Sequence, residues 1–349
     1  MAYTTINKST DYFDTTLWTG NATARNITTP FQPDFTWIKP RSFAENHVLF
    51  DAVRGATKRI ISNTADAEAT NTTMLTAFNS TSFSIGTNNN VNKNSDTFAS
   101  WNWKAGTSVS GNTTGSGSYK SYTGSVSTTS GFSIIKYQGN GSSGHTIPHH
   151  LGGTAEMIII KNLGATTDWI VYHKDIPSAN TRKISLNSTD YYNTDSSMWN
   201  NTSPNATNFT LGSSSSLNSN NGNYIAYCFK SITGFSKIGS YIGNNGGSNG
   251  VFSYLGFKPK FIMQKLATNE SGGQWYIRDD ARAPINVVDT SLYANSSNAE
   301  NNSADIDFLS NGFKTRENGQ SQQDAGFTYI YMAFGQTLVG SNKVPCTAR

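Results

Sequence analysis

A short alternation of apolar and polar residues occurs three times in the chain, each time at the end of a segment of about 100 residues. The clearest copy is NYIAYCF at 223–229, and the others occupy 96–103 and 327–334. Side chains alternate across a β-strand, so each run has two faces. We predict that the more apolar face is buried and that the other face, of mixed polarity, is only half covered. The faces predicted to be buried are Ala99, Trp101 and Trp103, then Ile225, Tyr227 and Phe229, then Ile330, Met332 and Phe334.

Further landmarks recur at nearly constant spacing, which indicates three copies of one domain. In each copy an apolar run ends in a lysine, and an aromatic or histidine residue opens the next run 8, 8 and 10 residues later, as in a β-hairpin. A phenylalanine in another short run precedes the last aromatic residue of each copy by 20, 20 and 21 residues. These landmarks are Lys39, Lys161 and Lys265; His47, Trp169 and Trp275; and Phe83, Phe209 and Phe313.

The pattern predicts an all-β chain, because helical periodicity is nearly absent and short apolar runs alternate with polar turns. We predict three tandem antiparallel β-sandwich repeats of jelly-roll or lectin-like type. One short helix is expected at 64–69, with a counterpart at 296–301. The predicted boundaries are 1–104 for repeat 1, 105–130 for a Gly/Ser/Thr linker, 131–230 for repeat 2, 231–335 for repeat 3 and 336–349 for a C-terminal tail.

The connections predict how the repeats are arranged. The Gly/Ser/Thr-rich linker is expected to be flexible or laid along the surface. Only residues 231–234 join repeats 2 and 3, which favours two packed copies with a more independent repeat 1. A quasi-threefold arrangement and a row of domains are both open at this stage, and the linker and tail are expected to be held by neighbouring subunits.

Composition narrows the function classes. Apolar residues make up 36% and charged residues 14% of the chain, and the formal net charge is +4. No cluster of Lys and Arg accompanies this weak positive balance, so nucleic-acid binding is not expected. The N-terminal residues lack a basic and apolar leader, and no apolar run approaches the length of a membrane span, so we expect neither a signal peptide nor membrane insertion. The two cysteines, Cys228 and Cys346, imply no disulfide framework, and Cys228 is expected to be a small packed residue.

Candidate chemistry is sparse. The histidines at 145, 149 and 150 could converge on a metal ion, but a polar loop is the simpler interpretation. Asp51 with Arg54 and Asp279 with Arg282 recur in two copies, and each is interpreted either as a charge pair that holds a loop or as a cation or sugar site. His47 is expected to be a packed ring. No nucleophile elbow, phosphate-binding loop, zinc motif or paired carboxylates stand out, so we predict no catalytic residues, no cofactor, no metal and no enzymatic activity.

Aromatic side chains in polar surroundings are the remaining candidates for recognition, because Tyr and Trp rings stack on sugars and on partner surfaces. These residues are equally interpretable as core or interface anchors. The candidate glycan or partner contacts are Tyr191, Tyr192, Trp199, Tyr119 and Tyr122.

Four segments carry a resemblance to a known family: FQPDFTWIK at 31–39, LFDAVRGATK at 49–58, DIDFLSNGFK at 305–314 and VGSNKVP at 339–345. With these, the chain resembles the tandem-repeat, tail-fibre-like virion structural proteins of marine tailed bacteriophages, including cyanophages. The resemblance extends from about residue 12 over nearly the whole chain. It implies a structural component of a phage particle and brings no catalytic or binding residues with it.

The resulting hypothesis is a non-enzymatic structural protein on the exterior of a tailed-phage virion, as a fibre, tail appendage or capsid decoration. Its expected partners are other virion proteins in a homo-oligomeric or larger assembly, and a host surface glycan is a further expected contact. Two alternatives belong to other classes. One is a free lectin-like carbohydrate-binding module, and the other is a polysaccharide depolymerase.

Overall fold

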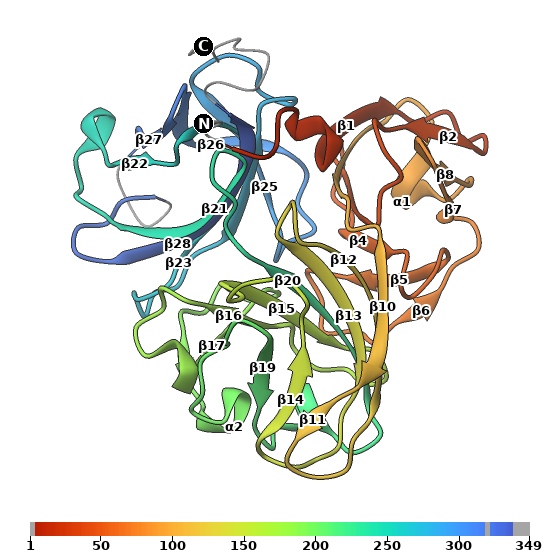
Figure 1. Cartoon of the computed structure of the whole chain (residues 1–349). Coiled ribbons are helices and arrows are strands. Elements are labelled where there is room, and N and C mark those ends of the chain that lie inside the picture. Colours follow the sequence, from red (N-terminus) through yellow and green to blue (C-terminus); the bar gives the residue numbers. More distant parts are fainter. Residues whose placement is uncertain (1–3, 318–321, 338–349) are drawn as a thin grey trace.

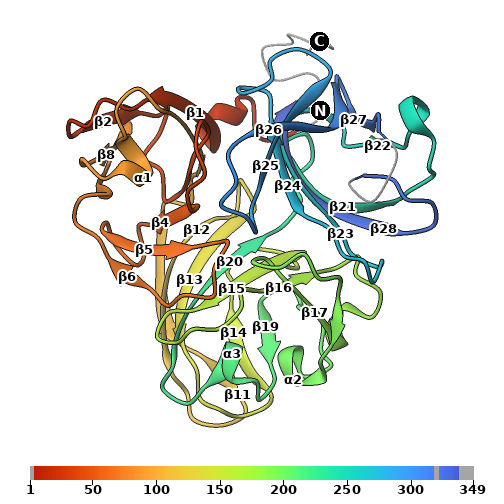
Figure 2. The ribbon, with the colours of Figure 1, turned by 180° about the vertical axis from the view of Figure 1, so that it is seen from behind.

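The computed structural model describes residues 4–317 and 322–337. Its paired strands are antiparallel, and the helices in this part have only three or four residues, so the all-β prediction is confirmed. No helix within the described residues is long and apolar enough to cross a membrane. Figure 1 shows three lobes around a common centre, which correspond to repeats 1, 2 and 3, and Figure 2 shows the same three-way arrangement from behind.

Repeat 1 consists of a six-stranded and a three-stranded sheet. Its own core lies between the sheets and includes Ile38, Phe50, Leu75 and Phe83. Its elements are η1 (Ser9–Asp11), β1 (Phe13–Thr19), β2 (Arg25–Thr28), β3 (Phe35–Pro40), β4 (Val48–Asp51), β5 (Lys58–Ile61), β6 (Ala69–Thr70), β7 (Leu75–Asn79), β8 (Ser82–Ile85), α1 (Asn89–Asn92) and β9 (Thr97–Trp103).

Repeat 2 has the corresponding order of strands, with three short helices among them. Its elements are β13 (Phe132–Gln138), β14 (His145–Pro148), β15 (Met157–Asn162), β16 (Ile170–His173), η2 (Ala179–Thr181), β17 (Arg182–Ser185), β18 (Asn193–Thr194), α2 (Ser196–Trp199), β19 (Asn208–Leu211), α3 (Ser215–Asn218) and β20 (Asn223–Phe229).

Repeat 3 forms one continuous eight-stranded sheet, because its long strand β26 pairs on both sides and links the two halves. Its elements are β21 (Ser236–Ile242), η3 (Gly247–Asn249), β22 (Phe252–Tyr254), β23 (Phe257–Leu266), β24 (Trp275–Asp279), β25 (Val288–Tyr293), β26 (Asn301–Leu309), β27 (Gly312–Thr315) and β28 (Thr328–Thr337).

The three runs singled out in the sequence occupy the same place in each repeat. β9 lies between β1 and β3, β20 between β13 and β15, and β28 between β21 and β23. The lysine run and the aromatic-led run that follows it are hairpin partners in all three repeats, as predicted. The expectation of a half-covered second face is wrong, since Tyr224, Ala226 and Cys228 are fully buried. One face of each closing strand packs in the repeat's own sandwich, and the other packs where the repeats meet.

Residues 105–130 were expected to be a flexible or surface-laid linker held by neighbouring subunits, but they form strands that pair with repeat 2 of the same chain. They form β10 (Thr107–Asn112), β11 (Thr114–Gly115) and β12 (Ser121–Ser127). Strand β12 pairs with β13 along six residues, β10 pairs with β12, and β11 pairs with β14. The segment therefore covers two strand edges of repeat 2. Although the segment has few apolar side chains, backbone hydrogen bonds to these edges hold it in place.

Equivalent loops join each repeat to the next. At the junction of repeats 1 and 2, Glu68 N donates to Leu163 O and Thr167 N to Ala65 O. Two corresponding backbone bonds join repeat 2 to repeat 3 and repeat 3 to repeat 1: Tyr192 N to Ala267 O and Gly273 N to Thr189 O, then Glu300 N to Arg41 O and Glu45 N to Ser297 O. The helices expected at 64–69 and 296–301 are absent, because these segments are extended and their backbone groups are used by the neighbouring repeat.

The ring of repeats is closed. Oε1 of Gln336, in β28, accepts hydrogen bonds from the backbone N–H and the hydroxyl of Ser9 at 3.2 and 2.9 Å. Repeat 1 is therefore as integrated as repeats 2 and 3, contrary to the expected independence, and a linear row is ruled out. The tail was predicted at 336–349, but Gln336 and Thr337 belong to β28, and residues 338–349 lie outside the described residues.

Candidate functional site

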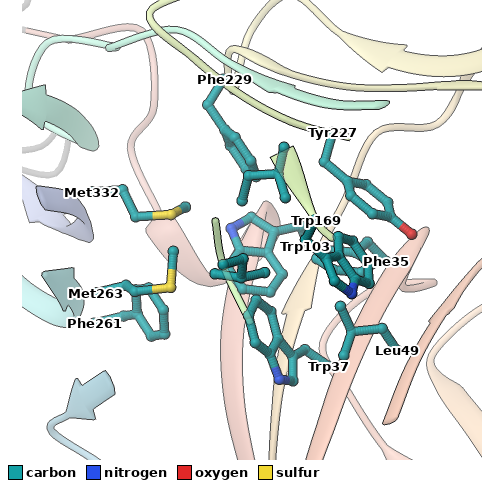
Figure 3. A pocket seen from close by; sticks show the side chains of 12 residues that line it. Phe35, Trp37, Leu49, Trp103, Trp169, Tyr227, Phe229, Phe261, Met263 and Met332 are labelled. Carbon is teal, nitrogen blue, oxygen red and sulfur yellow. The ribbon is translucent and has the colours of Figure 1, made fainter. Parts of the chain in front are cut away.

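The centre of the ring is an aromatic cluster to which all three repeats contribute. Figure 3 shows Phe35, Trp37 and Trp103 of repeat 1, Trp169, Tyr227 and Phe229 of repeat 2, and Phe261, Met263 and Met332 of repeat 3 directed toward one another. The space left among them is about 10 Å³, which admits at most one water molecule. The centre is therefore a packed core and offers no room for a ligand.

Buried polar contacts surround this core and link the repeats in a cycle. Tyr227 donates its hydroxyl to Oδ2 of Asp51 at 2.7 Å, and Trp101 donates its indole N–H to Oδ2 of Asp279 at 2.9 Å. The third equivalent position is His173, whose Nε2 lies 3.2 Å from the carbonyl oxygen of Tyr331. Burial lowers the pKa of His173 to about 4, so the ring is neutral at pH 7.

The charge pairs found in the sequence are part of this cycle. Arg54 Nε lies 2.5 Å from Asp51 Oδ2, and Arg282 Nε lies 2.6 Å from Asp279 Oδ2, with all four side chains inaccessible to solvent. Desolvation opposes the charge of Arg54, but Asp51 and its hydrogen bonds prevail and raise its pKa. Of the two interpretations, the geometry fits a charge pair that holds a loop. The aspartates also accept hydrogen bonds from neighbouring repeats, so they hold the repeats together as well.

Glu300 extends the pairing across the junction of repeats 3 and 1. Its carboxylate binds Arg282 Nη1 at 3.0 Å within repeat 3 and Arg41 of repeat 1 through two contacts at 2.7 and 2.9 Å. Desolvation would raise the pKa of Glu300, but the hydrogen bond and charge of Arg41, together with Arg282, lower it.

Two of the three lysines that mark the repeats also serve the junctions, whereas Lys39 Nζ donates to Pro40 O within its own repeat. Lys161 Nζ donates to the carbonyls of Ala65 and Thr167 at 2.8 and 2.6 Å, and Lys265 Nζ donates to Thr189 O at 2.6 Å. Burial lowers the pKa of Lys161 to about 8 and that of Lys265 to about 7. In both cases a carbonyl from the preceding repeat receives the ammonium group, so the lysine recognises its neighbour.

A surface groove of about 580 Å³ lies between repeat 1 and the β10–β12 hairpin. Its volume is within the range of small-molecule sites. Ser108 pairs with Ser125 and Ser110 with Thr123 across the two strands, so their hydroxyls share one face. The groove is lined by Gln32, Asp34, Ala52, Val53, Gly106, Ser108, Val109, Ser110, Thr123, Gly124 and Ser125.

Asp34 is the acidic residue of this groove. Its Oδ2 accepts from the backbone N–H of Ala105 at 2.9 Å, and its Oδ1 accepts from the hydroxyl of Ser125 at 3.4 Å. Burial raises the pKa of Asp34, and these two bonds oppose the rise. The carboxylate fastens the start of the 105–130 segment to repeat 1, much as Glu156 accepts from the backbone N–H of Ser231 at the end of repeat 2.

The groove offers hydroxyl groups, backbone groups and short apolar side chains, together with one carboxylate. Hydroxyls both donate and accept hydrogen bonds, which suits a polyhydroxylated ligand. The groove was not predictable from the sequence, because its residue types are common throughout the chain. The signal available beforehand was the alternation TSVSGN at 107–112, which fits a strand.

The five aromatic candidates do not gather at one place. Trp199 is fully buried, and its indole N–H donates to Arg182 O at 2.9 Å, so its contacts are those of a core anchor. Tyr122 is 7% exposed, and its hydroxyl lies 2.8 Å from His150 Nε2. It lines a smaller hollow of about 240 Å³ beside β12 and β13. Tyr119 is 66% exposed and is not among the lining of either surface hollow.

Tyr191 and Tyr192 lie together at the junction of repeats 2 and 3. Their rings are 5.3 Å apart, and the guanidinium of Arg182 lies 3.9 Å from the ring centre of Tyr192. Both tyrosines are half-buried. The structure thus places them at an inter-repeat seam, with part of each side chain accessible.

The histidines of the 145–150 segment each have a separate partner. His145 lies between Asn218 and Thr113, and His149 Nε2 lies 3.0 Å from Asn205 O. Within residues 4–317 and 322–337, no group of three His, Cys, Asp or Glu side chains is arranged to hold a metal ion. His47 is fully buried and accepts a hydrogen bond from Trp37 Nε1 at 2.8 Å, so its prediction as a packed ring is confirmed.

A protein-family model described as a domain of unknown function (DUF7483) matches residues 8–337. The chain belongs to this family. The matched range begins next to Ser9 and ends next to Gln336, the two residues that close the ring, so the family unit comprises the whole ring of repeats. No curated protein matches the sequence.

Proposed function

We propose that this protein is a non-enzymatic structural component of a tailed-phage virion, displayed on the particle exterior as a fibre, tail appendage or capsid decoration. The virion class rests on the sequence resemblance. The structural observation that supports it is the closed ring, in which three repeats share one aromatic core and are joined by buried hydrogen bonds to Asp51 and Asp279. A building block that must keep its shape outside the cell benefits from such interlocking, because no repeat separates without exposing apolar surface and breaking buried hydrogen bonds.

A contribution to attachment on a host surface glycan is the second part of the proposal. The groove between repeat 1 and the β10–β12 hairpin supports it, since serine and threonine hydroxyls face a buried carboxylate there. The same groove favours a free lectin-like module over a depolymerase. Glycoside hydrolysis ordinarily requires two carboxylates across the scissile bond, and Asp34 is the single carboxylate among the lining residues described.

Mass spectrometry of purified particles of the encoding phage tests the virion assignment. We expect peptides of this protein at a fixed copy number after density-gradient purification. Their absence from particles, with the protein present in the lysate, would contradict the proposal and favour the free lectin. Release of reducing sugar from host polysaccharide by the purified protein would instead support the depolymerase.

A glycan array tests the groove separately. Ser110→Trp places an indole in the groove, and we expect it to abolish binding that the wild-type protein shows. Ser213→Trp, an exposed position that does not line the groove, is the matched control and should bind as the wild type does. Equal binding by wild type and Ser110→Trp would place the glycan elsewhere.

A further inference from the structure

The guanidinium of Arg278 is sealed inside repeat 3 without a hydrogen-bond partner. Arg278 lies in β24 and is fully buried, and its Nε, Nη1 and Nη2 atoms have no acceptor in the described part of the chain. Burial lowers the pKa of Arg278 to about 10, so the group still carries its charge at pH 7. An isolated buried cation is among the most costly arrangements in a protein interior.

The surroundings compensate only part of this charge. The ring centre of Tyr276 lies 4.6 Å from the guanidinium carbon, which gives a cation–π contact. Such a contact is weaker than the penalty for burying an ion, so a deficit remains. Asp305 is near enough to influence Arg278 electrostatically, yet the two side chains form no ion pair.

Comparison of the repeats shows that the sandwich does not need an arginine here. Arg278 is paired in register with Ile262 on β23. The corresponding residues are Phe50, paired with Thr36 in repeat 1, and Tyr172, paired with Ile158 in repeat 2. Repeats 1 and 2 fill this position with an aromatic ring, so the charge in repeat 3 is a local addition.

The neighbouring pair of the same hairpins is altered in the same way. Repeat 1 has Ile38 opposite Val48, and repeat 2 has Ile160 opposite Ile170. Repeat 3 has Gln264 opposite Tyr276. Gln322 is also fully buried in repeat 3, and its side-chain amide has no hydrogen-bond partner. The backbone carbonyl of Gln322 accepts a hydrogen bond from the Tyr241 hydroxyl at 2.6 Å. Arg278 and Gln264 are therefore polar residues of repeat 3 at positions where repeats 1 and 2 carry Phe50 or Tyr172 and Ile38 or Ile160.

We propose that the interior of repeat 3 binds a small anion on the guanidinium of Arg278. A planar carboxylate of the size of formate, or a halide, fits this chemistry, because arginine presents a fork of N–H donors to such ions. The complete burial of Arg278 restricts the ligand to a small ion that enters through fluctuations of the sandwich. The bound ion supplies the countercharge that the described residues do not.

Thermal unfolding at constant ionic strength tests this site. The series replaces sodium gluconate, whose anion is too large for the interior, by sodium formate or sodium chloride. We expect the melting temperature of the wild type to rise by several degrees with formate or chloride concentration, as for a ligand that binds the folded state alone. Identical melting in all three salts would overturn the proposal.

Two variants give the test its specificity. Arg278→Phe copies the residue of repeat 1, and we expect it to fold and to lose the dependence on formate and chloride. Arg182→Met removes a different arginine that lies over a tyrosine ring but donates to Pro177 O, and it should keep that dependence. A persistent anion effect in Arg278→Phe would refute the site.

Asp305→Asn tests the alternative that Asp305, and not a bound anion, neutralises Arg278. If Asp305 is the true partner of Arg278 in solution, this variant loses stability and the wild type shows no anion effect, which overturns the proposal. If the proposal holds, Asp305→Asn keeps the anion effect. A bromide soak of crystals should place an anomalous peak beside Arg278, and an empty site at saturating bromide would also count against it.

Discussion

Trp101 donates its indole N–H to Oδ2 of Asp279 over 2.9 Å, although 178 residues separate the two along the chain. The same carboxylate oxygen lies 2.6 Å from Arg282 Nε, and neither member of that ion pair is accessible to solvent. One buried carboxylate therefore joins a cation of repeat 3 to an indole of repeat 1. Separation of these repeats would break the buried hydrogen bond from Trp101, while the ion pair of Asp279 with Arg282 stays within repeat 3.

Replacement of this carboxylate should destabilise the whole ring. We expect Asp279→Ala to lower the free energy of unfolding by about 3–5 kcal/mol, because it leaves Arg282 as an uncompensated buried charge. Urea denaturation followed by tryptophan fluorescence measures the loss. Asp11→Ala removes an exposed pair with Lys8 and should cost about 1 kcal/mol or less. Equal losses in the two variants would contradict the proposed importance of burial.

Acid should weaken the fold partly through His173. Burial lowers the pKa of this imidazole from its usual 6.5 to about 4. Below pH 6.5 the unfolded chain therefore binds the proton more readily than the folded chain, and stability falls as the pH decreases from 6.5 to 4. The full effect is about 3 kcal/mol for this group. Above pH 6.5 the contribution is complete.

The variant His173→Gln removes the titration while keeping a polar side chain. We expect its stability to depend less steeply on pH between 6.5 and 4, measured by urea denaturation at several pH values. Other histidines with lowered pKa values contribute equally to both proteins. An unchanged slope would show that His173 does not titrate as its burial implies.

Pairing of the 105–130 segment with repeat 2 is testable at Gly124. A Cβ atom at this position would lie 2.5 Å from the carbonyl oxygen of Ile134 and 2.7 Å from Cδ1 of Ile135. We expect Gly124→Val to break the β12–β13 pairing, to cost about 1–3 kcal/mol and to make residues 105–130 sensitive to protease. Gly164→Ala meets nothing closer than 3.9 Å and should behave as the wild type. Protease resistance in Gly124→Val would argue against the pairing.

Trp199 and Tyr119 should respond in opposite ways to truncation. Trp199 is fully buried and packs edge-on to Tyr172, so Trp199→Ala should lower stability by about 3–5 kcal/mol. Tyr119 is 66% exposed, and Tyr119→Ala should leave the unfolding transition unchanged. Chemical denaturation compares them. A stable Trp199→Ala protein would reopen its role as a surface contact.

The thiol of Cys228 should be inert in the native protein. Burial raises its pKa to about 12, and the residue is free and inaccessible. In a Cys346→Ser background we expect no reaction with a thiol reagent at pH 8 until denaturant is added. Rapid labelling of the native variant would contradict the burial of the closing strand.

Long-range spacing in the sequence predicted much of the fold. The hairpins that follow Lys39, Lys161 and Lys265, and the closing strands before Trp103, Phe229 and Phe334, lie where the alternation indicates. These strands could be predicted because the alternation of apolar and polar residues within each strand is enough to indicate it. Cys228 and His47 were interpretable for the same reason, as members of such runs.

The contacts between repeats were not predictable in this way. Asp51 and Asp279 were noticed as recurring charges, but their partners Tyr227 and Trp101 lie in other repeats. The groove depends on Asp34 and on a hairpin whose serines resemble any polar linker. The hairpin forms because β12 makes backbone hydrogen bonds to the edge of β13. Backbone pairing of this kind leaves no pattern of side chains in the sequence.

The β10–β12 hairpin belongs to repeat 2 alone, so the near-threefold ring carries this groove once. Each chain therefore offers one such groove and not three, although its core is nearly threefold symmetric. Under the proposed attachment to a host glycan, multivalent binding would require several rings held side by side, with an effective concentration set by their spacing. Weak binding by a single ring and tight binding by an array would be two properties of one surface.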